Sequence, residues 1–274
     1  MNSHIDTFGR ISQKKVINVG NLILMIMVAV FVVTVIVINF HDFNNLYELQ
    51  VLQTALDVFS MALCLVLFGA CYYDNAGTEG VKLQFLRLTV LLYAALFLDF
   101  VCWFYGEDPA IRTFYFIMET LLGFMNPLFG IMCFEYILDY MDLRKKSFAK
   151  MYSLYIYSAG ALAVFARIIN IFFPIYFRID ENGYYFRTAY YPVSVVITVG
   201  ILLFCLYIVF SNRKQLRTYQ FWILTLFFIA VITGVILDVF ILDLTLAFPT
   251  AAVLLLLIYS VLNLQRSRDH SIIE

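Results

Sequence analysis

One arginine and four carboxylates stand inside otherwise apolar stretches of this sequence, and they are the residues best placed to do chemistry. Arg167 lies in a long apolar run, where an isolated guanidinium costs several kcal/mol unless it finds partners or water. Four carboxylates in other apolar runs are candidates to meet it: Asp57, Asp99, Glu119 and Asp238. An arginine among acids can bind a charged ligand, relay protons or tie helices together.

The depths of these five side chains favour one cluster. At a rise of about 1.5 Å per helical residue, each lies roughly 5–10 Å from the outer end of its helix. Asn170 shares a helical face with Arg167, three residues further on. Two interpretations stay open. Either Arg167 bonds one or two carboxylates and fastens helices, or the surplus of acids lines a hydrated pocket that binds a small polar or cationic ligand. The surplus tips the balance towards the pocket.

The sequence argues against an enzyme, a metal site and a cofactor. None of the three histidines, His4, His41 and His270, falls within an apolar run, whereas haem, di-iron and zinc membrane enzymes need histidine ligands inside the bundle. The five cysteines have no metal-binding spacing. No glycine-rich phosphate loop or Ser–His–acid pattern occurs. An aspartate-only protease stays formally open, but a nearby arginine argues against two aspartates sharing a proton. We expect no catalytic residue, metal or cofactor.

The elements that must position these residues are membrane-spanning helices. The chain is 63% hydrophobic, well above the roughly half of a soluble domain. Its net charge of −1 provides no basic face for nucleic acid. A span needs roughly 20 apolar residues. Eight stretches qualify: Asn21–Phe40, Val51–Tyr72, Gln84–Phe104, Thr113–Leu138, Met151–Pro174, Tyr191–Phe210, Tyr219–Ile241 and Ala247–Leu264. The sequence therefore predicts an all-α, polytopic transmembrane bundle of eight helices.

The distribution of lysine and arginine predicts the orientation of the bundle. Placing the N-terminus inside puts fourteen of them in cytoplasmic segments, near residues 10–15, 82–87, 144–150, 213–217 and 266–268. Only Arg112, Arg178 and Arg187 then lie outside. Both termini are therefore expected in the cytoplasm, which requires an even number of spans. Residues 1–20 form a cytoplasmic segment, residues 21–264 the transmembrane domain, and residues 265–274 a cytoplasmic tail or the start of a linker.

The longest outer loop, between the fifth and sixth spans, predicts a short extracellular β-hairpin. Asn182-Gly183 favours a two-residue turn because both residues tolerate positive φ. The flanking Tyr and Phe residues favour strands. The hairpin either covers the charged cluster as a lid or lies on the headgroups as a connector. The candidate lid residues are Arg178, Asn182, Gly183 and Arg187.

A second acidic group lies at the inner end of the fourth span. Glu135, Asp139 and Asp142 directly precede the basic run Arg144–Lys146. Alternating charges of this kind are typical of a loop in water. We therefore expect these acids to be solvated and to form no site.

Two stretches carry a resemblance to a known family. The first is the hairpin text Asp180–Arg187, and the second runs from Phe221 through Phe248-Pro249 to Gln265. They resemble the membrane-sensor region of bacterial diguanylate cyclases and histidine kinases. Thr188 replaces a glycine of the family pattern, and a proline common in the first of the last two helices is missing. The resemblance implies a cytoplasmic output domain starting shortly after Gln265, so the chain is either a sensor fragment or a homologue that acts through a partner.

These observations together predict a sensory module of the bacterial plasma membrane. Its expected partners are the lipid bilayer, a small extracellular ligand and a cytoplasmic signalling domain or protein, and a homodimer is plausible because the family's output domains work in pairs. The ligand would bind at Arg167, Asn170 and the four acids. The alternative is a small transporter in which Arg167 and the carboxylates form a relay.

Overall fold

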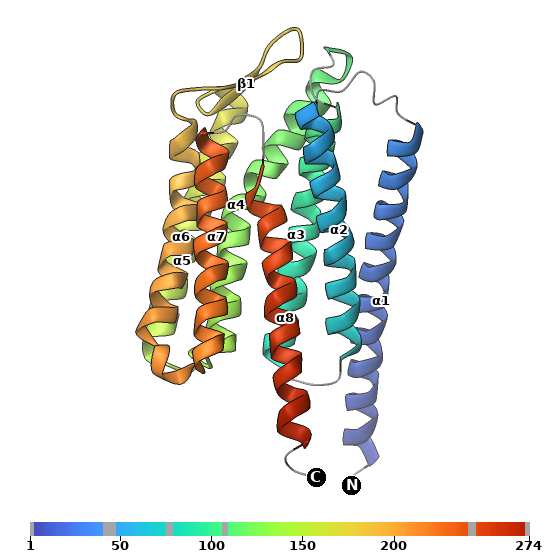
Figure 1. The fold of residues 1–274 in the computed structure, drawn as a ribbon, viewed down its shortest axis with the longest axis vertical. Helices are drawn as coiled ribbons and strands as arrows, with labels where there is room; N and C mark the ends of the chain where they lie inside the picture. Colours follow the sequence, from blue (N-terminus) through green and yellow to red (C-terminus); the bar gives the residue numbers. More distant parts are fainter. Residues whose placement is uncertain (1–2, 41–47, 75–78, 106–108, 241–244, 272–274) are drawn as a thin grey trace.

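The computed structural model describes residues 3–40, 48–74, 79–105, 109–240 and 245–271, which form eight α-helices and one two-stranded hairpin (Figure 1). The helices are α1 (Ser3–Phe40), α2 (Glu48–Tyr73), α3 (Glu79–Tyr105), α4 (Arg112–Tyr140), α5 (Ser147–Phe172), α6 (Tyr191–Ser211), α7 (Thr218–Phe240) and α8 (Ala247–Ser271). Two 3₁₀ turns, η2 (Pro109–Ile111) and η3 (Arg213–Gln215), precede α4 and follow α6. The strands are β1 (Phe177–Ile179) and β2 (Tyr185–Arg187).

The predicted eight-helix transmembrane bundle is confirmed. Among the described residues, seven helices are long and apolar enough to cross a membrane, and α8 contributes a shorter apolar stretch, Ala247–Val261. Helix α1 begins at Ser3, well before the apolar run that opens at Asn21. Hydropathy marks where a helix enters lipid, but backbone hydrogen bonds within a helix continue into water, so a helix can extend beyond its span.

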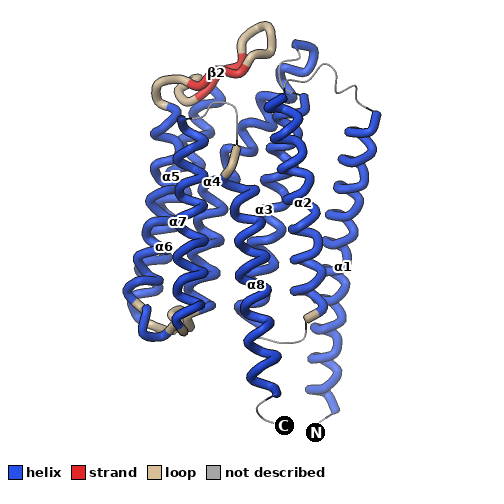
Figure 2. The backbone as a smooth tube through the Cα atoms, in the orientation of Figure 1, coloured by secondary structure: helices blue, strands red, loops and turns tan. Residues whose placement is uncertain are grey.

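The helices pack in two groups joined by α4 and α8. Helices α5, α6 and α7 lie together on one side, and α1, α2 and α3 on the other (Figure 1). Helix α8 packs against both α7 and α2, and α4 contacts α3, α5 and α6. The hairpin covers the end of the bundle opposite to the start of α1 and the end of α8 (Figure 2). The two ends of the described chain therefore lie on the same side.

Small residues let α7 and α8 approach closely near the start of α8. A Cβ atom added to Gly234 would lie 2.9 Å from the Ala247 Cα atom, which is too close for any side chain. Ala251 and Ala252, one turn further along α8, are fully buried. The packing fixes the first turn of α8 against α7 at the level of the charged residues.

The predicted hairpin is confirmed, but a two-residue turn is wrong. The strands pair antiparallel, with Phe177 opposite Arg187 and Ile179 opposite Tyr185. Only Gly183 adopts positive φ in this loop (88°), and the Asp180 amide donates to the Tyr184 carbonyl. The Asp180 carboxylate accepts two loop amides at 2.9 Å. The sequence instead forms a three-residue loop with Gly183 in the left-handed conformation. This loop is stable because the Asp180 carboxylate accepts amides that would otherwise lack an acceptor.

Candidate functional site

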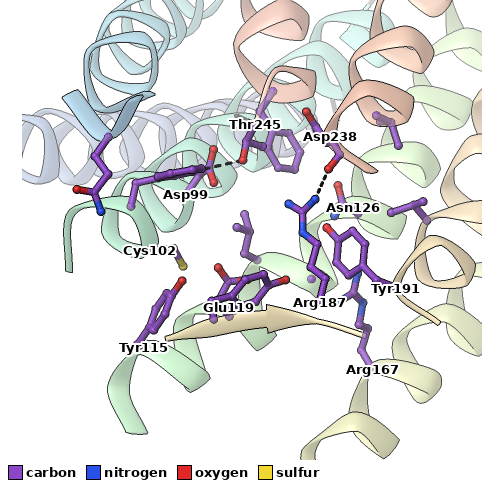
Figure 3. A pocket seen from close by; sticks show the side chains of 18 residues that line it. Asp99, Cys102, Tyr115, Glu119, Asn126, Arg167, Arg187, Tyr191, Asp238 and Thr245 are labelled. Carbon is purple, nitrogen blue, oxygen red and sulfur yellow. Dashed lines mark hydrogen bonds between the residues drawn. The ribbon is translucent and has the colours of Figure 1, made fainter. Parts of the chain in front are cut away.

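A cavity of about 260 Å³ lies beneath the hairpin, and residues of seven helices, α2 to α8, line it. Its charged lining residues are Asp99, Glu119, Arg167, Arg187 and Asp238. The polar, aromatic and apolar lining comprises Gln50, Cys102, Trp103, Tyr115, Leu122, Gly123, Asn126, Tyr185, Tyr191, Val195, Val235, Thr245 and Phe248. Figure 3 shows this site from close by. The predicted cluster thus brings four of its five ionisable residues to one cavity, and a fifth charge, Arg187, comes from the hairpin.

Arg167 is 5% exposed and is held by neutral groups. Its Nη2 atom donates to the Ser194 hydroxyl at 2.9 Å, and its guanidinium carbon lies 5.5 Å from the Tyr176 ring centre and 6.0 Å from that of Tyr191. No ion pair joins it to a carboxylate of the described residues within 4.0 Å, since the pairs found there involve Arg144 and Lys145. Direct fastening of helices by Arg167–carboxylate pairs is therefore wrong, because ring faces and a hydroxyl hold the cation instead.

Arg187 enters the cavity from the end of β2. Its Nη1 donates to the backbone carbonyl of Asp238 on α7, and its guanidinium carbon lies 4.4 Å from the Tyr191 ring centre. Its Nε is buried and has no hydrogen-bond partner among the described residues. Burial raises the pKa of Tyr185, the neighbouring strand residue, so its hydroxyl stays neutral beside this cation.

Glu119 projects from α4 into the cavity, near Cys102 and Tyr115 (Figure 3). One turn further, Gly123 leaves space for Arg167: a Cβ atom there would lie 3.1 Å from the guanidinium carbon. Pro127 continues the helix but has no N–H to donate to the Gly123 carbonyl. Because Gly123 has no side chain, this face of α4 leaves room for the Arg167 side chain to reach the cavity.

Gln53 organises the deeper acids. Its side-chain nitrogen lies 3.1 Å from oxygens of both Asp57 and Asp99 and 3.0 Å from the Thr245 carbonyl. Its oxygen accepts the Thr245 amide at 3.1 Å. Asp57 is completely buried behind Asp99, does not line the cavity, and its second oxygen has no hydrogen-bond partner in the described chain. The amide of Gln53 thus links α2 and α3 to the segment that opens α8.

Asp238 caps α8 from the neighbouring helix. Its carboxylate accepts the Leu246 amide at 2.7 Å, directly before the first residue of α8. The first amides of a helix lack internal acceptors, so a carboxylate there is stabilising. We call Asp238, Thr245 and Leu246 the α7–α8 corner. Gln53 and Arg187 both bond to this corner, so the cavity wall and the start of α8 are one hydrogen-bonded unit.

The structure places the remaining predicted residues outside the cavity. Asn170 fastens the hairpin: its side-chain oxygen accepts the Tyr176 amide at 2.6 Å. Of the four lid residues, Arg187 alone lines the cavity. Arg178 stacks over Phe186 and points outward, and Asn182 and Gly183 form the loop of the hairpin. The lid therefore contributes one functional side chain, and the rest of the hairpin positions it.

Two signals in the sequence could have identified Gln53 and Tyr185, which we did not predict. Gln53 precedes Asp57 by four residues and so shares its helical face. Tyr185 and Arg187 are two apart on one strand and so face the same side. The other polar lining residues, Trp103, Tyr115, Tyr191 and Thr245, have no comparable pattern, since aromatic residues near helix ends are common at membrane interfaces.

At the end of the bundle opposite to the hairpin, which we call the inner end, the acids of α4 form a closed cluster, so a solvated loop is wrong for Glu135. This residue is 5% exposed. Arg144 donates to Glu135 at 2.5 Å and to Asp139 at 2.9 Å, and the Tyr157 hydroxyl donates to Glu135 at 2.5 Å. Hydrogen bonds from Arg144 to Asp139 and Glu135, together with their charges, raise the pKa of the guanidinium against the effect of burial. Only Asp142, paired with Lys145 at 3.5 Å, is as exposed as expected.

No group of three or more potential metal ligands occurs among the described residues. Comparison of the chain with protein-family models, curated proteins and solved structures finds no match. The resemblance to bacterial sensor regions stays a prediction made from the sequence.

Proposed function

We propose that this chain is the sensory module of a membrane signalling system, with the cavity as its ligand site and α8 as its output. The excess of lysine and arginine in segments at the end opposite to the hairpin supports a hairpin that faces outward and chain ends in the cytoplasm. A bacterial plasma membrane and a cytoplasmic signalling domain or protein, working as a homodimer, complete the proposal.

The α7–α8 corner is the observation that carries this proposal. Arg187 from the hairpin bonds to Asp238, Gln53 from α2 bonds to Thr245, and Asp238 itself caps α8. A ligand that contacts Arg187 or Asp99 therefore competes for groups that hold the start of α8. The helix then runs to Ser271 at the opposite end of the bundle.

The energy for signalling comes from the difference in ligand affinity between two packings of the helices. The Nε atom of Arg187 is buried and has no hydrogen-bond partner among the described residues, which costs free energy. This cost weakens the contact of Arg187 with Asp238 and favours a second packing in which Nε is bonded. A ligand that draws the guanidinium off the Asp238 carbonyl would release one side of the corner. Helix α8 would then shift against α7 and α2, the two helices that it contacts most.

The test is a distance measurement between spin labels at the inner ends of two helices. Labels at Ser211→Cys on α6 and Ser260→Cys on α8 report on the position of α8, and the five native cysteines are buried and resist labelling. Arg187→Gln removes the charge that holds the corner. Arg178→Gln makes the same change one pair away on the outer face of the hairpin and is the matched control.

We expect Arg187→Gln to shift or broaden the distance distribution and Arg178→Gln to reproduce that of the unsubstituted protein. Equal distributions in all three proteins would contradict coupling of the cavity to α8. Counterflow uptake of a solute into liposomes, with α8 unmoved, would favour the transporter instead.

A further inference from the structure

The two arginines of the cavity share one aromatic ring without a neutralising acid in contact. The guanidinium carbons of Arg167 and Arg187 lie 6.0 and 4.4 Å from the centre of the Tyr191 ring. Neither forms an ion pair with a described carboxylate within 4.0 Å. Cation–π contacts stabilise a buried guanidinium by less than its desolvation costs. Two neighbouring cations held in this way form a site that lacks an anion.

Arg167 keeps donors available for that anion. Ser194 is its only hydrogen-bond acceptor among the described residues, although a guanidinium has five N–H groups. The side chain is 5% exposed, and it borders the cavity beside the bare backbone at Gly123. The remaining donors are therefore shielded from bulk water yet reach the cavity, where a carboxylate could accept two of them at once.

Asp99 lies on the other side of the same cavity from the two arginines. Asp99, Cys102 and Tyr115 face Arg187, Tyr191 and Arg167 across the space, with Glu119 between them (Figure 3). The third acid, Asp238, lies beside Arg187, but its carboxylate accepts the Leu246 amide at the start of α8. The Gln53 amide donates to Asp99 at 3.1 Å, and Cys102 and Tyr115 lie near Glu119, so both carboxylates have neutral neighbours. Among the described residues, neither Asp99 nor Glu119 forms an ion pair, and neither arginine has a carboxylate within 4.0 Å.

We infer that the ligand is a small zwitterion of amino-acid type. Its carboxylate binds at Arg167 and Arg187, and its ammonium group binds at Glu119 and Asp99. The cavity of about 260 Å³ lies just below the ~300–1,000 Å³ of drug-sized sites, so it suits a free amino acid rather than a peptide or lipid. This inference rests on the proposed function, because it names the ligand class of the same site.

The experiment measures thermal stabilisation and calorimetric binding with the purified full chain in nanodiscs. The probes are the twenty common amino acids and glycine betaine, together with matched compounds that lack one charge, namely the corresponding carboxylic acids and amines. We expect at least one zwitterion to bind. Its matched acid and amine should bind at least ~10-fold more weakly, because each leaves a buried counter-group of the cavity unpaired.

Two substitutions assign the ends of the ligand. Arg167→Gln should abolish the preference for the zwitterion over the amine, and Glu119→Gln should abolish the preference over the carboxylic acid. Arg178→Gln and Glu181→Gln change the same charges on the exposed face of the hairpin and should leave both preferences intact. The comparison of ligands in the unsubstituted protein needs neither variant to fold.

The outcomes separate this inference from the proposed function. Binding of the simple acid or the simple amine as tightly as every zwitterion would overturn the zwitterion while leaving a ligand site in place. Failure of every zwitterion to bind would overturn it as well. Unmoved spin labels in Arg187→Gln would instead overturn the sensory function, whatever binds in the cavity.

Discussion

The bundle contains two charged clusters, one at each end, and they differ in how their arginines are satisfied. At the inner end, Arg144 bonds to both Glu135 and Asp139, and Tyr157 completes the Glu135 carboxylate. At the outer end, Arg167 and Arg187 line a cavity with three acids but pair with none of them within 4.0 Å in the described chain. The same residue types thus form ion pairs that join parts of the chain at one end, and a cavity with unpaired charges at the other.

The difference follows from the neighbours of each cation. Arg144 lies in a short loop and reaches back over the last turns of α4, where acids at positions 135 and 139 share one helical face. Arg167 instead comes from α5, and its direct contacts are rings and a hydroxyl. A buried charge without a counter-ion weakens a fold, so it is retained where a binding partner can supply the missing charge.

The largest expected effect concerns the corner that the outer cavity shares with α8. Gly234→Ala places a Cβ atom 2.9 Å from the Ala247 backbone, which cannot rotate away as a side chain could. Overpacking of this kind costs about 1–3 kcal/mol in unfolding free energy. Gly200→Ala is the matched control, because nothing lies within 4 Å of its added Cβ atom. Denaturation in mixed micelles measures both, and equal stability of the two variants would contradict the close α7–α8 contact.

The next effect concerns the closed inner cluster. Arg144→Gln leaves Glu135 without its cation, and we expect a loss of about 1–2 kcal/mol because hydrogen bonds to charged groups are worth that much even near water. Lys145→Gln removes an exposed pair and should change stability little. Binding at the outer cavity should be unchanged in both. A stability as high as that of the unsubstituted protein in Arg144→Gln would show that the cluster is not a fastening.

Arg167→Gln sharpens the comparison because we expect its effect on stability to be opposite in sign to that of Arg144→Gln. Removing a buried guanidinium that has no carboxylate in contact should leave the ligand-free protein as stable or more stable, since its desolvation costs several kcal/mol. The same substitution should weaken binding of the zwitterion to the level of its matched amine. Thermal unfolding without and with the bound zwitterion measures both. A large loss of stability in the ligand-free variant would mean that Arg167 is a structural fastening like Arg144.

The smallest effect is expected at Asp57. One of its oxygens accepts from Gln53 and the other has no partner in the described residues, so Asp57→Asn keeps the shape and the contact. We expect ligand affinity within about threefold of the original, because this residue does not touch the cavity. Calorimetric titration measures it. A tenfold loss would place Asp57 within the binding site after all.

The sequence predicted the helices and the hairpin because hydropathy and turn residues act locally. The convergence of Asp99, Glu119, Arg167 and Asp238 could also be anticipated, because counting residues from the end of each helix gives the depth of its side chains in the membrane. Which side chains actually touch could not be derived. That depends on the rotation of each helix about its axis, which packing determines.

Arg187 and Glu135 illustrate this limit. Arg187 was a candidate lid residue and its alternation with Tyr185 turns it into the cavity, but its bond to Asp238 depends on how the hairpin packs on α7. Glu135 was expected in water, yet the chain folds back so that Arg144 and Tyr157 cover it. These contacts join residues of different elements, so a local pattern does not determine them.

Hydrogen–deuterium exchange of the α7–α8 corner tests most directly whether the outer cavity controls α8. The Thr245 and Leu246 amides donate to Gln53 and Asp238, so their exchange reports whether the corner is closed. Arg187→Gln should accelerate exchange in the peptide that contains these amides, while Arg178→Gln and the inner peptide around Glu135 remain unchanged. Unaltered exchange at the corner, or equal acceleration throughout the bundle, would contradict the account.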